Sequence, residues 1–143
     1  MKCSLFIDKN KEEEILIYAH EETSLVKDII SLATLSDKTL TGTFNEEIKV
    51  LAPNEITCFI SDNNKVYALI KDKRYVIKKR LYQIEEMMDE SFIKINQSCL
   101  ANRRRILKFQ ASIGGSLMVI FDNGYKDYVS RRELKNIKQR MGL

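Results

Sequence analysis

The sequence predicts a mainly β fold with short helices (α+β), in which a small β-β-α lobe precedes a hairpin-rich antiparallel domain. Short apolar runs rich in Ile, Val, Tyr and Phe recur between residues 47 and 129, and turn signals such as Asp-Asn-Asn, Gly-Gly-Ser and Asp-Asn-Gly separate most of them. Two segments interrupt this rhythm with the 3.6-residue apolar period of a helix. Because the chain has 143 residues, 44% of them hydrophobic, and only one Pro, we expect one main globular domain.

The first third of the chain is expected to form the small lobe. Residues 2–8 and 14–20 are apolar runs of strand length, so we expect them to pair as antiparallel strands. Thr23 and Ser24 precede apolar residues at helical spacing, and either can serve as N-cap of a helix over residues 24–35. Residues 41–46 are expected to be part of a connector. We therefore place an acidic β-β-α lobe at residues 1–44 and a second domain at 45–143.

The second domain is expected to consist of short strands and two amphipathic helices. The apolar runs predict strands at residues 47–51, 56–61, 66–71, 74–78, 92–95, 106–110, 117–121 and 126–129. Apolar residues spaced three and four apart predict helices at residues 81–88 and 131–141. The alternation of strands with tight turns is typical of an antiparallel β domain.

Charge is distributed unevenly along the chain. Residues 1–50 hold six Lys and ten acidic residues, a formal charge of −4, whereas residues 51–143 hold 18 Lys plus Arg and ten acidic residues, a formal charge of +8. A basic domain attracts phosphate backbones, although Lys and Arg are also ordinary solubilising residues. The sequence thus indicates that the two parts meet different partners.

No pattern in the sequence indicates an enzyme, a cofactor or a metal site. The motifs GxSxG, GxxxxGK[ST], HExxH and GxGxxG are absent, and His20 is the single histidine. Cys3, Cys58 and Cys99 are widely spaced and lie among apolar residues, so we interpret them as small buried hydrophobic residues. No apolar run approaches the length of a spanning helix or resembles a signal peptide, so we expect a cytoplasmic protein. The first 45 residues are too few for a phosphorylated receiver domain.

Polar and basic side chains gather at the ends of several expected strands. They are the run Asn96-Gln97-Ser98, the run Asn102-Arg103-Arg104-Arg105 and the run Ser130-Arg131-Arg132. Arg suits guanine and Asn or Gln suits adenine in the major groove, while Ser, Lys and backbone amides hold phosphates. Loops at strand ends can project such side chains into a groove of duplex DNA.

Two motifs in this region carry a resemblance to a known family. An FxKIxxSxxxN run from Phe92 to Asn102 is followed by Asp122-Asn123-Gly124 and then by Val129-Ser130-Arg131-Arg132. In this order they resemble the LytTR-type DNA-binding domain of bacterial transcriptional regulators, over about residues 45–143. The resemblance implies an elongated arrangement of small antiparallel β-sheets whose loops contact successive major grooves. The short N-terminal lobe is similar to that of compact family members without a receiver domain.

The resemblance also implies roles for individual residues. Contacts to bases are expected from four residues, namely Lys65, Asn96, Gln97 and Arg132. Phosphate contacts or support of the loops are expected from Ser98, Asn102, Arg103 and Arg131. Many relatives have His and a basic residue where Asn96 and Gln97 stand, so the preferred DNA sequence is expected to differ here.

These observations favour a transcriptional regulator that binds duplex DNA as a homodimer on repeated half-sites. A protein-interaction or ligand-sensing module with a solubilising basic face is the alternative. An RNA-binding β domain is a third possibility, for which Tyr67, Tyr75 and Tyr125 could supply stacking. The N-terminal lobe could mediate dimerisation, bind a ligand or dock to a protein, including a membrane partner.

Overall fold

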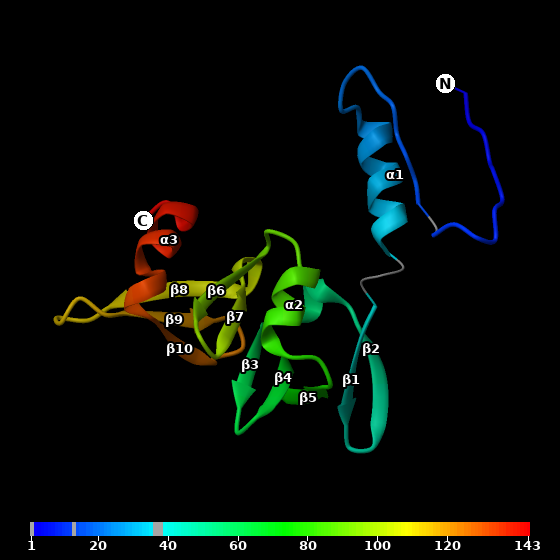
Figure 1. The fold of residues 1–143 in the computed structure, drawn as a ribbon. Helices are drawn as coiled ribbons and strands as arrows, with labels where there is room; N and C mark the ends of the chain where they lie inside the picture. Colours follow the sequence, from blue (N-terminus) through cyan, green and yellow to red (C-terminus); the bar gives the residue numbers. More distant parts are fainter. Residues whose placement is uncertain (1, 13, 36–38) are drawn as a thin grey trace. The chain divides into compact units, whose positions relative to one another are not determined.

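The computed structural model describes residues 2–12, 14–35 and 39–143 of the chain (Figure 1). It divides into two compact units, Met1–Asp37 and Lys38–Leu143. The mainly β fold with short helices is confirmed, since the described residues contain ten strands and three α-helices. The strand at Leu40–Phe44 lies in the second unit, which therefore begins before residue 45.

The first unit contains the helix α1, Ser24–Leu35, as expected. The N–H of Val26 donates to Thr23 Oγ1 at 3.3 Å, so Thr23 acts as the N-cap. The two expected strands are wrong, because residues 2–8 and 14–20 form no strand. Apolar side chains in these segments are exposed, for example Phe6 at 88% and Tyr18 at 93%. An isolated hairpin is marginal in water, so apolar composition alone does not produce a ladder here.

The second unit is built on a seven-stranded antiparallel sheet in the order β2-β1-β5-β4-β3-β7-β6. Its strands are β1 (Leu40–Phe44), β2 (Glu47–Leu51), β3 (Cys58–Asp62), β4 (Lys65–Ile70), β5 (Lys73–Ile77), β6 (Phe92–Asn96) and β7 (Cys99–Asn102). The helix α2, Leu81–Met87, connects β5 to β6. Two short 3-10 turns, η2 (Pro53–Glu55) and η3 (Arg103–Arg105), flank β3 and β7.

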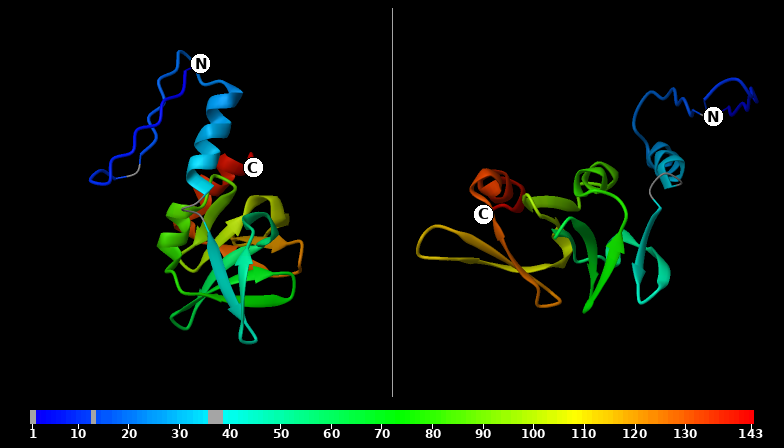
Figure 2. Two further views of the ribbon diagram at one scale, coloured as in Figure 1. Left: turned by 90° about the vertical axis from the view of Figure 1, so that its right-hand side faces the viewer. Right: turned by 60° about the horizontal axis from the view of Figure 1, so that its bottom comes forward.

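A three-stranded antiparallel sheet, in the order β10-β9-β8, follows the larger sheet. It contains β8 (Ile106–Ala111), β9 (Leu117–Phe121) and β10 (Lys126–Val129), after which the helix α3 (Arg131–Met141) ends at Gly142 in the left-handed conformation. The β8–β9 and β1–β2 hairpins lie at opposite ends of this unit in Figure 1 and in the right-hand view of Figure 2. The elongated arrangement of antiparallel sheets is thus confirmed.

The apolar core consists of two clusters that use alternate residues of the same strands. Phe59, Phe92 and Leu100 pack in a cluster with Ile84 of α2. The neighbouring residues of these strands, such as Cys58 and Ile93, pack in a cluster with the three-stranded sheet and α3. Because side chains alternate between the faces of a strand, β3, β7 and β6, which form one end of the sheet, are covered on both faces. Cys58 and Cys99 are buried as expected, but Cys3 is exposed.

The expected connector at residues 41–46 is a strand and a turn. Strand β1 pairs with β2 through Asn45 and Glu46, which both have positive φ, of 48° and 66°. Two such residues are the requirement of a two-residue hairpin turn, which is most often filled by Asn-Gly. Strand β7 was also not expected, because four buried residues between two polar runs carry little periodicity.

We expect Gly42→Ala to lower the free energy of unfolding by about 2 kcal/mol, because the added methyl group overpacks the core. A Cβ atom at Gly42 would lie 2.7 Å from Tyr75 Cβ and 2.8 Å from Leu51 Cδ1. Denaturant titration measures the effect, and Gly114→Ala is the control because a Cβ atom at Gly114 meets nothing within 4 Å. An equal midpoint for the two variants would contradict this account of the packing.

Candidate nucleic-acid interface

Three turns of the second unit carry the exposed candidate residues. Lys65 begins β4, directly after a tight turn in which Asn63 and Asn64 have φ of 51° and 64°. Gln97 and Ser98 form the exposed turn between β6 and β7. Arg131 and Arg132, also exposed, occupy the first turn of α3, a position at which the side chains extend from the end of an element.

Backbone hydrogen bonds hold these three turns beside one another. The N–H of Ser61, at the end of β3, donates to the carbonyl of Ser98 at 2.8 Å. The N–H of Ser130, the residue before α3, donates to the carbonyl of Ile95 at 2.8 Å. The β6–β7 turn is therefore tied on one side to the β3–β4 hairpin and on the other to the start of α3.

Asn96 occupies a structural position within this arrangement. Its side chain is 3% exposed, and its Nδ2 donates to Tyr128 O at 2.8 Å and to Asp127 Oδ1 at 3.0 Å. Its Oδ1 accepts the N–H of Ser98 at 2.8 Å. Both ends of the amide group are thus engaged within the protein, an arrangement that favours support of the turn over the base contact expected for Asn96.

Asp127 continues this network into the core beneath the turn. One carboxylate oxygen accepts from Asn96 and from the N–H of Tyr128 at 2.8 Å, and the other accepts from the Tyr125 hydroxyl at 3.3 Å. Burial and the nearby Asp127 charge raise the pKa of Tyr125 well above its ordinary value, so the phenol stays a donor. The hydrogen bond between Cys99 and Cys58, together with burial, likewise raises the pKa of Cys99, which keeps it a thiol.

Asn102 and Arg103 hold the segment that follows β7. Asn102 is 1% exposed, and its Nδ2 donates to Ile56 O at 2.8 Å while its Oδ1 accepts the N–H of Arg104. Arg103 Nη2 donates to Arg140 O at 2.9 Å, at the carbonyl end of α3. Of the two roles expected for this pair, the geometry favours support of the loops.

Arg105, the third arginine of the run, also forms hydrogen bonds within the protein. Arg105 donates from Nη2 to Asn54 O at 2.9 Å and from Nη1 to Asp122 Oδ2 at 3.2 Å. Two of the three consecutive arginines thus connect elements distant in sequence. One charge of the run is therefore paired with a carboxylate, and the Arg103 guanidinium is held in place by a neutral carbonyl.

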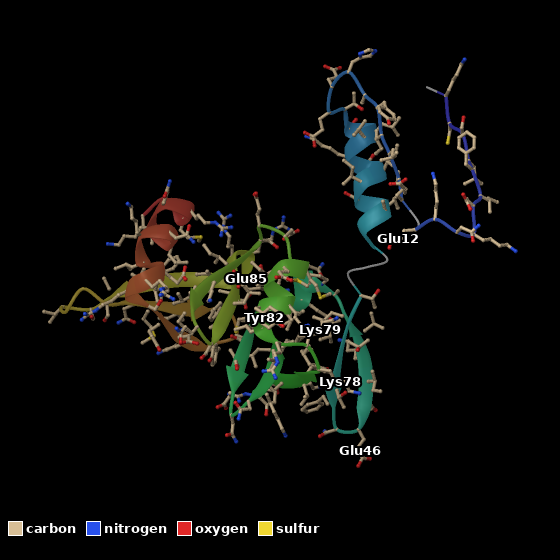
Figure 3. The ribbon with its side chains drawn as sticks, in the orientation of Figure 1. Glu12, Glu46, Lys78, Lys79, Tyr82 and Glu85 are labelled. Atoms are coloured by element: carbon tan, nitrogen blue, oxygen red, sulfur yellow. The ribbon has the colours of Figure 1, made fainter. Side chains whose placement is uncertain are left out.

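A basic groove, which we define by Lys65, Lys78, Lys79, Arg80, Lys94 and Gln97, extends beside two of these turns. It has a volume of about 640 Å³ and is lined by five cationic side chains and one carboxylate, that of Glu85. Figure 3 labels Lys78 and Lys79 in the connection between β5 and α2, with Tyr82 and Glu85 on the helix. Lys78, Lys79, Arg80 and Lys94 were not identified from the sequence, although Lys78-Lys79-Arg80 is a visible basic run.

The residues that the structure describes contain no group of three or more His, Cys, Asp or Glu side chains placed to hold a metal ion. Among the helices within residues 2–12, 14–35 and 39–143, none is long and apolar enough to cross a membrane.

The fold and these turns define a β-rich domain with a polar and basic surface, and comparison with known proteins identifies its family. Residues 46–142 match the family described as the LytTr DNA-binding domain, so the chain belongs to that family. It is 31% identical over 146 residues to an uncharacterized HTH-type transcriptional regulator of Staphylococcus aureus (strain NCTC 8325 / PS 47), covering 100% of this chain and 99% of the relative. A similar regulator from strain MW2 is 32% identical over the same coverage.

The architecture also matches a solved structure. A LytTr DNA-binding domain from Bacillus cereus superimposes with a TM-score of 0.69 and 18% identity, covering 74% of this chain and 99% of that domain. At 18% identity, this similarity shows that the two proteins share a fold.

The order of the elements differs from that of a helix-turn-helix motif. Five strands separate α1 from α2 and another five separate α2 from α3, so consecutive α-helices do not form a helix-turn-helix pair in the part that the structure describes.

Proposed function

We propose that this chain is a bacterial transcriptional regulator that binds duplex DNA sequence-specifically through loops placed in the major groove. The observation that carries the proposal is the joining of three exposed turns, which present Lys65, Gln97 and Arg132, by hydrogen bonds between their backbones. Such turns can reach base edges while a rigid sheet fixes their spacing. No catalytic role is part of the proposal.

The proposed roles follow the exposure of each side chain. Lys65, Gln97 and Arg132 are exposed and are assigned to bases, since Arg and Lys suit guanine and Gln suits adenine. Ser98 and Arg131 are exposed beside them and are assigned to phosphates. Three further residues are assigned to support of the turns, namely Asn96, Asn102 and Arg103.

Selection of duplexes from a random pool by the full chain tests this function. We expect enrichment of one sequence, and we expect its affinity to fall by about 10³–10⁵ between 50 and 200 mM salt if six to ten phosphates are neutralised. Single-stranded RNA should compete poorly. If duplex affinity does not change with salt and no sequence is enriched, the result would instead favour the protein-interaction or ligand-sensing module.

We also propose that the acting species is a homodimer in the cytoplasm that binds repeated half-sites. Exposed apolar side chains of the first unit, such as Leu5, Phe6 and Ile7, support an association through that unit, because a large exposed apolar patch is unusual on a monomer. An unidentified protein or ligand is the alternative occupant.

We expect light scattering on the full chain to give twice the monomer mass. Selected sites should contain two half-sites about 10–10.5 base pairs apart, or a multiple of this distance. A monomer with single half-sites would contradict the dimer and leave the DNA-binding function in place.

A further inference from the structure

We propose that the basic groove binds the phosphodiester backbone of the same duplex whose bases the neighbouring turns contact. Lys78, Lys79, Arg80 and Lys94 are the phosphate-binding residues in this proposal. The inference rests on the proposed function and adds to it phosphate contacts from residues that lie outside the three recognition turns.

The charge of the groove supports an anionic occupant. Its lining includes five cationic side chains against the single carboxylate of Glu85. The ion pairs among the described residues join Lys49 to Glu55, Arg74 to Asp62 and Arg105 to Asp122, so the groove cations remain free. Like charges gathered in one hollow repel one another, and a polyanion relieves that repulsion and releases its own counterions on binding.

The backbone beneath these cations is fixed at both ends. Strand β5 ends at the buried Ile77, and the following helix buries Ile84. Between them the N–H of Arg80 donates to Gln83 Oε1 at 2.9 Å, and the carbonyl of Arg80 accepts the N–H of Ile84 at 3.1 Å. The exposed side chains of Lys78 and Lys79 therefore extend from an ordered connection, which lowers the entropic cost of holding a phosphate.

The position of the groove supports DNA as the source of the phosphate. Lys65 and Gln97, which we assign to bases, are themselves part of its lining. Phosphate contacts commonly set the register of a protein on the duplex while adjacent side chains read base edges. A backbone that enters the groove would thus lie beside the bases that the β3–β4 and β6–β7 turns approach.

Neutral donors complete the lining. Tyr82 is 60% exposed on α2, and Asn64 lies in the turn before Lys65. Hydroxyl and amide groups are frequent partners of phosphate oxygens. Glu85 is the one lining group that opposes an anion, so its removal should act in the opposite direction to removal of a lysine.

The first test compares two double variants of the full chain, Lys78→Ala/Lys79→Ala and Lys9→Ala/Lys11→Ala. Both remove two exposed lysines, but the second pair lies in the first unit. We expect the groove variant to weaken binding to selected and unrelated duplexes alike. Between 50 and 200 mM salt, the parent should lose about tenfold more affinity than the groove variant, as expected for two lost phosphate contacts. Thermal unfolding should be the same for both variants.

The second test exploits the two adjacent carboxylates of α2. Both side chains are exposed, but Glu85 lines the groove and Glu86 lies outside it. We expect Glu85→Gln to tighten binding to any duplex about twofold at low salt, and Glu86→Gln to change it less.

The outcomes separate this inference from the function on which it rests. If the parent selects a duplex with steep salt dependence, but the groove variant retains the affinity and slope of the control variant, the groove is no backbone site and the proposed function stands. If the parent binds no duplex at all, both proposals are wrong.

Discussion

Replacing Asn96 by alanine is expected to lower the free energy of unfolding by roughly 3 kcal/mol, because it leaves buried partners without hydrogen bonds. The Tyr128 carbonyl, the Asp127 carboxylate and the Ser98 N–H each lose their contact with the Asn96 amide. The turn that carries Gln97 would then lose its anchor to β10. Binding to every duplex sequence should weaken together, since the whole turn is displaced.

The adjacent residue gives the matched control for this prediction. Gln97 is exposed, so Gln97→Ala should change the free energy of unfolding by less than about 0.5 kcal/mol. It should nevertheless alter the preferred sequence at one position. Denaturant titration and duplex binding on both variants measure the contrast, and an Asn96→Ala protein as stable as the Gln97→Ala protein would refute the structural role.

Arg132→Ala is expected to cost about 1–3 kcal/mol of affinity for the selected duplex and to relax the preference at one base pair. The side chain is exposed in the first turn of α3, and the preceding Ser130 is tied to Ile95 beside the β6–β7 turn. A guanidinium in this position can form two parallel hydrogen bonds with guanine.

Arg131→Ala is the control for Arg132, because it removes the same charge one residue earlier in the same turn. We expect it to weaken all duplexes similarly and to reduce the salt slope by about one. Competition binding against duplexes substituted at single positions measures both effects. Equal affinity of Arg132→Ala and the parent for the selected site would show that Arg132 does not read a base.

The β6–β7 hairpin shows which structural features the sequence predicts and which it does not. The run around Asn96 and Gln97 predicts a strand followed by a polar turn, and both are present. Alternation predicts that Asn96 points outward because Ile95 points inward. A register shift between Lys94 and Asn96 breaks that alternation, so that both Ile95 and Asn96 are buried.

The hydrogen-bond partner that allows the Asn96 side chain to be buried could not be predicted from nearby residues. Asp127 lies 31 positions later in the chain and reaches Asn96 only because β10 folds back beside β6. The same holds for Arg103, whose guanidinium is bound by the carbonyl of Arg140, 37 positions away. The sequence left phosphate contact and support of the loops open for Arg103, and this contact between distant segments is what favours support.

The sequence by itself determined the class of fold, most strands and all three α-helices, because apolar periodicity and turn residues are local properties of the chain. It also supplied the residue types that we propose for a DNA-reading surface. Tertiary structure alone decided which of those residues face inward and that Lys65, Lys94 and Gln97 share a groove with Lys78 and Lys79. The physical reason is that strand pairing and burial depend on residues far apart in sequence, whose contacts no local pattern encodes.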